Sequence, residues 1–272
     1  MTRTRKDGAS GRRPLLLLLA LLTAVSGFLF LSSLEQSRRR EHFWEEVRSA
    51  RREWTGTATE WENVLPAYQA LYERNRDMVG WLDMTIVGVR IDFPVMQTRE
   101  DPEFYLRRDF DGNPDSTGTP FLDYRCSVSP RRCFNLILYG HYVSGYKMFG
   151  GLVDYADERV ARENRRFRFD TLAERGVYEV EAAFFYDATE ARLYLPSEDA
   201  GDQAYTFYNY IELDSEEGFS CFLQNIKDQT LYSWEPEITP EDQLLTIVCC
   251  APEPYTGLEE GGRFVVIAKR VE

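Results

Sequence analysis

The chain has 272 residues, of which 43% are hydrophobic and 14% aromatic, enough for one packed domain of about 200 residues with additional terminal segments. Its formal net charge of -13 excludes the basic surface that nucleic-acid binding requires, so we expect no nucleic-acid partner. Five cysteines are too few for a disulfide scaffold of this size, and their odd number leaves at least one thiol unpaired within the chain.

The amino terminus predicts a membrane anchor. Residues 1–13 form a basic tail, and residues 14–34 contain no charge, close to the ~20 apolar residues that a helix needs to cross a bilayer. Basic flanks stay in the cytoplasm, which predicts a single-pass protein of the cell membrane with the rest of the chain outside the cell. Ala24-Val25-Ser26 resembles a signal-peptidase site, but apolar sequence continues to Leu31. This length favours an uncleaved anchor over a removed signal peptide.

Residues 35–60 predict a juxtamembrane helical stalk, followed by a globular domain at residues 61–272. The stretch from Glu35 to about Arg76 is charged, lacks proline until Pro66, and carries an apolar stripe at spacings of three, four or seven residues. Because this repeat is short and irregular, a helix that packs its apolar stripe on the chain's own domain is a better interpretation than a coiled-coil dimer.

Beyond Asn75 the pattern is typical of short β-strands. Runs rich in β-branched and aromatic residues occur at 84–88, 91–96, 121–124, 135–141, 177–186, 206–213, 244–250 and 263–270. Two helices are expected between them, one at about Met148 to Glu163 and one after Asp214, where Glu217 completes a capping-box-like start. Many short strands with few helices predict a mainly β fold, a mixed and mostly antiparallel sheet or barrel.

Three of these strands end or begin with a reactive side chain. One run ends at His141, the only histidine of the globular region; another ends on Cys249 and Cys250; the next begins at Arg263. A thiolate and a histidine can form a covalent intermediate and transfer protons, and an arginine can hold an oxyanion but cannot act as a base. Each residue alone is more often structural, but three at strand ends favour a cysteine hydrolase or transferase.

Alternation along the strand indicates which of the two adjacent thiols faces the site. Successive side chains point to opposite faces. Thr246 is four residues before Cys250 and therefore on the same face of the strand. Because Thr246 is the single polar residue within the run, this face is expected to be the polar one that carries Cys250. Cys249 is then expected to pack inward as a small apolar residue.

Other kinds of site fit less well. A zinc site would need ligands among the cysteines and His141, but the sequence has no CxxC or HExxH spacing, and no phosphate-binding GxxxxGK[ST] loop. Cys126 and Cys133, in an apparent loop, could instead form a local disulfide.

Taken together, these motifs resemble the class B sortases, membrane-anchored cysteine transpeptidases of Gram-positive bacteria. The similarity extends from about Leu71 to the end of the chain and includes LYERNRDMVGWL at 71–82, IDFPVMQ at 91–97, DF at 109–110, GTPFLD at 118–123, NLILYGH at 135–141 and MF at 148–149. The family's cysteine motif, Thr-Leu-x-Thr-Cys, corresponds to residues 246–250, so Cys249 replaces the usual threonine. The family arginine corresponds to Arg263, after a longer and more acidic connection.

The resemblance implies a sortase-like eight-stranded β-barrel with N-terminal helices, a helix in the loop before the cysteine strand, and no metal or organic cofactor. It implies that Cys250 attacks a Thr-X bond in the C-terminal sorting signal of a secreted protein, that His141 transfers protons and that Arg263 holds the oxyanion. An amine of a cell-wall precursor or of another protein would then accept the acyl group. The alternatives are a membrane-tethered cysteine peptidase and a non-catalytic cell-envelope binding or scaffold protein.

Overall fold

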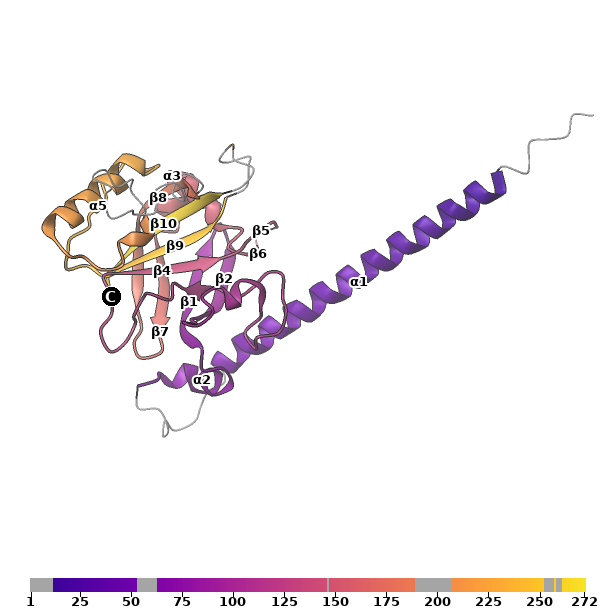
Figure 1. Ribbon diagram of the computed structural model, residues 1–272, viewed down its shortest axis with the longest axis horizontal. Helices are drawn as coiled ribbons and strands as arrows, with labels where there is room; N and C mark the ends of the chain where they lie inside the picture. Colours follow the sequence, from indigo (N-terminus) through magenta and orange to yellow (C-terminus); the bar gives the residue numbers. More distant parts are fainter. Residues whose placement is uncertain (1–11, 53–62, 146, 189–206, 252–256, 258–260) are drawn as a thin grey trace, which may run out of the picture. The chain divides into compact units, whose positions relative to one another are not determined.

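The chain consists of two units, Met1–Glu53 and Trp54–Glu272. The computed structural model describes residues 12–52, 63–145, 147–188, 207–251, 257 and 261–272 (Figure 1). The boundary predicted between stalk and catalytic domain, at residues 60 and 61, lies outside the described residues, as does the basic tail up to residue 11.

The described part of the first unit is one long helix, α1 (Arg12–Arg52). Its 41 residues extend about 60 Å at about 1.5 Å per residue. The large apolar side chains between Leu16 and Leu34 are exposed. Among the described residues this is the one helix that could cross a membrane by length and composition. The predicted anchor and most of the predicted stalk therefore belong to a single uninterrupted helix.

The second unit is built around a closed barrel of eight strands, which confirms the predicted fold class (Figure 1). Around the barrel the order is β1-β2-β3-β4-β9-β10-β8-β7, in which β2/β3 and β4/β9 pair in parallel and the other pairs are antiparallel. The strands are β1 (Met78–Ile86), β2 (Val89–Met96), β3 (Phe121–Leu122), β4 (Asn135–Gly140), β7 (Arg166–Thr171), β8 (Val177–Asp187), β9 (Leu244–Cys250) and β10 (Gly262–Arg270). A separate hairpin, β5 (Tyr142–Val143) and β6 (Lys147–Met148), follows β4.

Short helices fill the connections between the strands. They are η1 (Pro66–Tyr68) and α2 (Gln69–Arg74) before β1, η2 (Phe104–Arg107) after β2, η3 (Leu152–Ala156) and α3 (Glu158–Glu163) before β7, and η4 (Phe207–Asn209) and α5 (Glu216–Gln229) between β8 and β9. The last of these is the helix expected in the loop before the cysteine strand. Its buried residues, Phe222 and Ile226, are four apart and therefore lie on one face.

The central strands are buried on both faces, which explains their nearly continuous apolar sequence. Every residue of β9 from Leu244 to Cys249 is buried, and so is β10 from Phe264 to Ala268. Alternate residues of a barrel strand fill the interior, and the others need a cover from outside. Thr246 is completely buried. The prediction that Thr246 marks a polar face of the strand, which was used to choose Cys250, was therefore wrong.

Two of the predicted elements differ from the structure. No strand forms at Phe207–Leu213 of the predicted run 206–213; the chain makes the 3-10 turn η4 and then irregular backbone. Phe207 and Ile211 are buried, whereas Asn209 between them, which strand alternation would place on the same face, is exposed. The helix predicted from Met148 to Glu163 is two short helices, because Asp157 has extended backbone and caps α3 by accepting a hydrogen bond from the Arg159 amide.

The start of α5 is also one residue later than predicted. The N-cap is Ser215, whose side chain accepts a hydrogen bond from the Gly218 amide at 2.9 Å, and not Asp214. Ser215 has the extended backbone that an N-cap requires, and the position of a cap cannot be chosen from sequence when two capping residue types are adjacent.

A buried hydrogen bond joins β4 to β9. The Thr246 hydroxyl donates to Oδ1 of Asn135 at 2.9 Å, and both residues are fully buried. The Asn135 Nδ2 atom has no partner among the described residues, so the bond from Thr246 satisfies the oxygen of this buried amide and leaves its nitrogen unsatisfied there. The contact lies within the parallel pairing of Asn135 with Leu244 and Ile137 with Thr246.

We predict that Thr246→Val lowers the free energy of unfolding by about 1–3 kcal/mol, because it keeps the shape of the side chain and leaves Oδ1 of Asn135 without a donor. Urea denaturation would measure the change. Thr85→Val, at an exposed position of β1, is the matched control and should change stability by less than about 0.5 kcal/mol. Equal effects of the two substitutions would show that the buried hydrogen bond does not stabilise the β4/β9 pair.

Candidate active site

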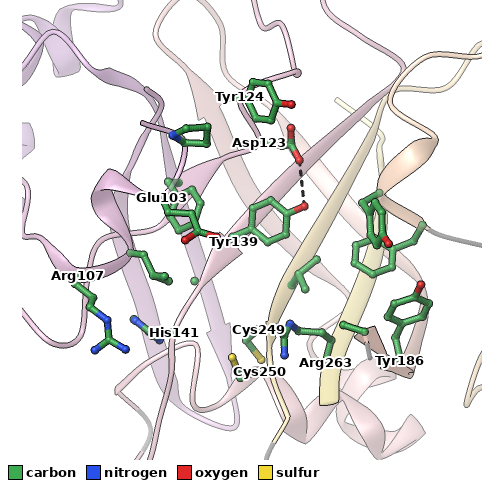
Figure 2. A pocket seen from close by; sticks show the side chains of 18 residues that line it. Glu103, Arg107, Asp123, Tyr124, Tyr139, His141, Tyr186, Cys249, Cys250 and Arg263 are labelled. Atoms are coloured by element: carbon green, nitrogen blue, oxygen red, sulfur yellow. Dashed lines mark hydrogen bonds between the residues drawn. The ribbon is translucent and has the colours of Figure 1, made fainter. Parts of the chain in front are cut away.

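The structure brings the three predicted site residues to one end of the barrel. Arg263 pairs directly with Cys250 across the antiparallel β9/β10 ladder. Gly140, the last residue of β4, pairs with Cys249 across the parallel β4/β9 ladder, so His141 follows beside the end of β9. All three line one cavity of about 550 Å³ (Figure 2).

His141 is held by contacts of the backbone on either side of it. A Cβ atom on Gly140 would lie 2.5 Å from the Phe149 ring, so glycine is required for this ring to pack against the end of β4. The Phe149 amide in turn donates to the His141 carbonyl at 3.0 Å. The resulting packing explains why the Tyr-Gly-His run and the Met-Phe pair, several residues apart, both contribute to the site.

The surroundings of the His141 imidazole favour its neutral form. Burial lowers its pKa below the usual value, and the positive charge of Arg107 acts in the same direction, while a hydrogen bond to the backbone of Leu106 raises it. The Nε2 atom is buried and has no hydrogen-bond partner among the described residues. This nitrogen is therefore available to exchange a proton with a bound group.

The two adjacent cysteines have opposite environments. Cys249 is 2% exposed and Cys250 is exposed at the end of β9. Burial raises the pKa of the Cys249 thiol well above its ordinary value, and the neighbouring Cys250 adds to this effect. Since the thiolate is the nucleophile, Cys249 is unsuited to attack, and Cys250 is the accessible thiol. The inward packing expected of Cys249 is thus what the structure shows.

Arg263 is half-buried at the start of β10. One guanidinium nitrogen, Nη1, donates to the carbonyl of Gly262 at 2.9 Å, which holds the side chain close to the backbone. Figure 2 shows Arg263 on the same wall of the cavity as Cys250. Its remaining donors are suited to an oxygen atom bound next to the thiol.

A hydrogen-bonded network forms another wall of the cavity. The Tyr139 hydroxyl donates to Asp123 at 3.1 Å (Figure 2). Arg125 makes two hydrogen bonds to the same carboxylate, at 2.9 and 2.8 Å. Although burial raises it, the pKa of Asp123 is held below its usual range by these contacts with Arg125. The carboxylate is therefore ionised and fully paired, which makes it a structural wall and not a proton donor.

Sequence reasoning missed the part of the site contributed by η2. Glu103, Leu106 and Arg107 line the cavity, and Arg107 lies close enough to His141 to influence its pKa. The segment 98–117 that holds them is charged and has no strand or helix periodicity. The one available signal was its place directly after a predicted strand, which is too general to identify a site.

The remaining cysteines and carboxylates provide neither a disulfide nor a metal centre in the described part of the chain. Cys126 and Cys133 are free, buried thiols that both donate to the carbonyl of Asn135, at 3.6 and 3.3 Å. No group of three or more histidine, cysteine or acidic side chains is placed to hold a metal ion among the residues that the structure describes.

Comparisons with known proteins decide the family. No family model matches the chain. Sortase B of Listeria monocytogenes is 30% identical over 203 residues, which cover 74% of this chain and 72% of that relative. Sortase B of Staphylococcus aureus is 28% identical over 213 residues, covering 78% and 77%. The chain belongs to the sortase B family.

Solved sortase B structures share its fold. The Staphylococcus aureus sortase B–substrate complex aligns with a TM-score of 0.68 at 22% identity, covering 87% of this chain and 98% of that one. A Bacillus anthracis protein described as similar to sortase B aligns with a TM-score of 0.65 at 28% identity, covering 84% and 93%. This sortase is accordingly an enzyme, a cysteine transpeptidase by family.

The exposure of the thiols predicts a labelling pattern. Brief treatment of the native enzyme with iodoacetamide should modify Cys250 and the exposed Cys221, and spare the three buried cysteines, as read by peptide mass mapping. Loss of activity should follow the label on Cys250, so a Cys221→Ser variant should be inactivated at the same rate. First labelling of Cys249 would mean that the register at the end of β9 is off by one residue.

Proposed function

We propose that Cys250 is the nucleophile of this sortase, that His141 is its general acid and base, and that Arg263 stabilises the oxyanion. The observation that carries this assignment is the convergence of these three side chains, from the ends of β4, β9 and β10, on one cavity. Retention of all three groups in one open cavity argues against a scaffold protein with a degenerate site.

In the first half-reaction the Cys250 thiolate attacks the carbonyl carbon of a Thr-X peptide bond. The negative charge moves to the carbonyl oxygen, beside the guanidinium of Arg263, which lies directly across the ladder from the thiol. When the C–N bond breaks, protonated His141 gives its proton to the departing amine. The products are an acyl-enzyme thioester and a free amine.

In the second half-reaction an acceptor amine attacks the thioester. His141 now takes the proton of the attacking nitrogen, and Arg263 again faces the oxyanion. The new amide leaves and the thiolate is restored. Because burial lowers the pKa of His141, the charged imidazolium is a minor form at neutral pH, and the reactive thiolate–imidazolium pair is a small fraction of the enzyme.

The proposed substrates are secreted proteins with a C-terminal sorting signal, and the proposed acceptor is an amine of a cell-wall precursor or of another protein. One solved relative is described as a sortase B–substrate complex, which supports substrate binding by this fold in general. We further propose that α1 anchors the enzyme in the cell membrane, with the tail at residues 1–13 in the cytoplasm and the barrel outside. Its exposed apolar side chains from Leu16 to Leu34 support this placement.

Mass analysis of the intact protein after incubation with candidate sorting peptides tests the assignment. A thioester should accumulate on Cys250, and addition of an amine should convert it into a new amide product. Cys250→Ala should form no thioester, whereas Cys249→Thr should retain most activity. A thioester that reacts only with water would identify a peptidase, and a labelled peptide containing Cys249 as the acyl carrier would refute the choice of nucleophile.

Arg263→Lys should reduce acylation by more than about tenfold, although the charge is kept, because a compact ammonium cannot reproduce the planar set of donors. Single-turnover acylation rates would measure it. Arg270→Lys, at the other end of β10 and paired with Glu174, is the control for the same substitution outside the cavity. A loss of less than tenfold at residue 263 would assign Arg263 a structural role.

Protease treatment of intact cells should degrade the barrel and leave a protected fragment of the first ~35 residues, a length set by the bilayer. Amino-terminal sequencing of the mature protein would provide the second measurement. A mature chain that begins at Gly27 would show that the apolar segment is a removed signal peptide.

A further inference from the structure

The turn η2 presents two opposite charges to the cavity. Glu103 immediately precedes this turn and Arg107 ends it; both side chains are exposed and both line the cavity. Although they are four residues apart, they form no ion pair with each other or with any other described residue. Asp123, the other carboxylate of the lining, is neutralised by Arg125. Glu103 and Arg107 are therefore available to a bound molecule.

The charge of Arg107 lies on the His141 side of the site, where an amine must bind, and Glu103 lines the same cavity. In both half-reactions the amine exchanges a proton with His141, so it lies against the imidazole and not against Arg263. Arg107 acts electrostatically on His141, and Figure 2 shows it on the opposite side of His141 from Cys250. A group attached close to the amine therefore comes within reach of η2.

Building on the transpeptidation proposed above, we propose that Glu103 and Arg107 select an acceptor whose amine stands next to a carboxylate, as on the α-carbon of an amino acid. Glu103 attracts the ammonium form, and the planar guanidinium of Arg107 binds the carboxylate. The ammonium loses one proton to solvent before attack, and His141 takes the second as the amide forms. An amine without a neighbouring anion would leave Arg107 unpaired.

The test uses the full-length enzyme in detergent micelles and two acceptors with the same skeleton, glycine and glycinamide. The ratio of the two ligation rates is measured for the wild type and for Arg107→Gln. We expect the ratio, glycine over glycinamide, to fall about fivefold in Arg107→Gln, the scale of a partly exposed charge pair. Arg99→Gln removes an exposed arginine of the same connection that does not line the cavity, and should leave the ratio unchanged.

This ratio separates recognition from general damage. A change in folding or in the pKa of His141 alters the rates with both acceptors and cancels in their ratio. The different basicities of the two amines are the same for wild type and variant, so they cancel when the two ratios are compared. Glu103→Gln should slow both acceptors by similar factors, because both carry an ammonium group. Arg107→Glu should shift the preference further toward glycinamide.

Three results would overturn the inference. An equal ratio in Arg107→Gln and wild type, while the thioester on Cys250 still forms and reacts, would refute acceptor selection and leave the transpeptidase assignment intact. An equal fall in Arg99→Gln would reduce the effect to the net charge of the surface. Absence of any thioester in the wild type would refute the proposed function and this inference together.

Discussion

The parallel pairing of β4 with β9 is the constraint on which the site depends. Neither strand alone contains two of the reactive groups, and Gly140 precedes its ladder partner Cys249 by 109 positions in the sequence. The register that places Gly140 opposite Cys249 also places His141 beside the exposed Cys250. Inside the barrel wall, the hydrogen bond between Thr246 and Asn135 lies in the same ladder. A shift of one residue would move every side chain of β9 to the other face and exchange the two thiols.

Burial distinguishes the two adjacent thiols more effectively than their order in the sequence does. The Cys249 side chain is enclosed by the barrel, and desolvation disfavours its thiolate. Cys250 follows where the strand leaves the sheet, so the same chemical group becomes accessible to solvent and to a substrate. The family threonine at position 249 is replaced here by another small residue that packs in the interior, which is consistent with a role in packing and not in bond formation.

The electrostatic design of the cavity separates its two sides. On one side Arg263 stands across the ladder from Cys250, where the proposed mechanism places the developing negative charge. On the other side burial, with a smaller contribution from Arg107, keeps the pKa of His141 low, which leaves the imidazole mostly neutral and able to accept a proton. Between them, Tyr139 and the Asp123–Arg125 pair form a rigid wall without net charge. The overall negative charge of the chain is thus not reproduced in its cavity.

By itself the sequence determined the class of fold, the strands that carry the reactive groups and the residue types at their ends, because strand periodicity and turn-forming residues are local properties of the chain. The resemblance of its motifs to class B sortases supplied the strand number and the roles. Only the tertiary structure decided how β4, β9 and β10 pair, which cysteine is accessible, and that η2 contributes Glu103 and Arg107 to the cavity. Each of these depends on contacts between segments distant in sequence. The same holds for the strand wrongly predicted at 206–213 and for the burial of Thr246 in β9. What a residue packs against is set by the fold, and an apolar or polar pattern within one segment does not reveal its neighbours.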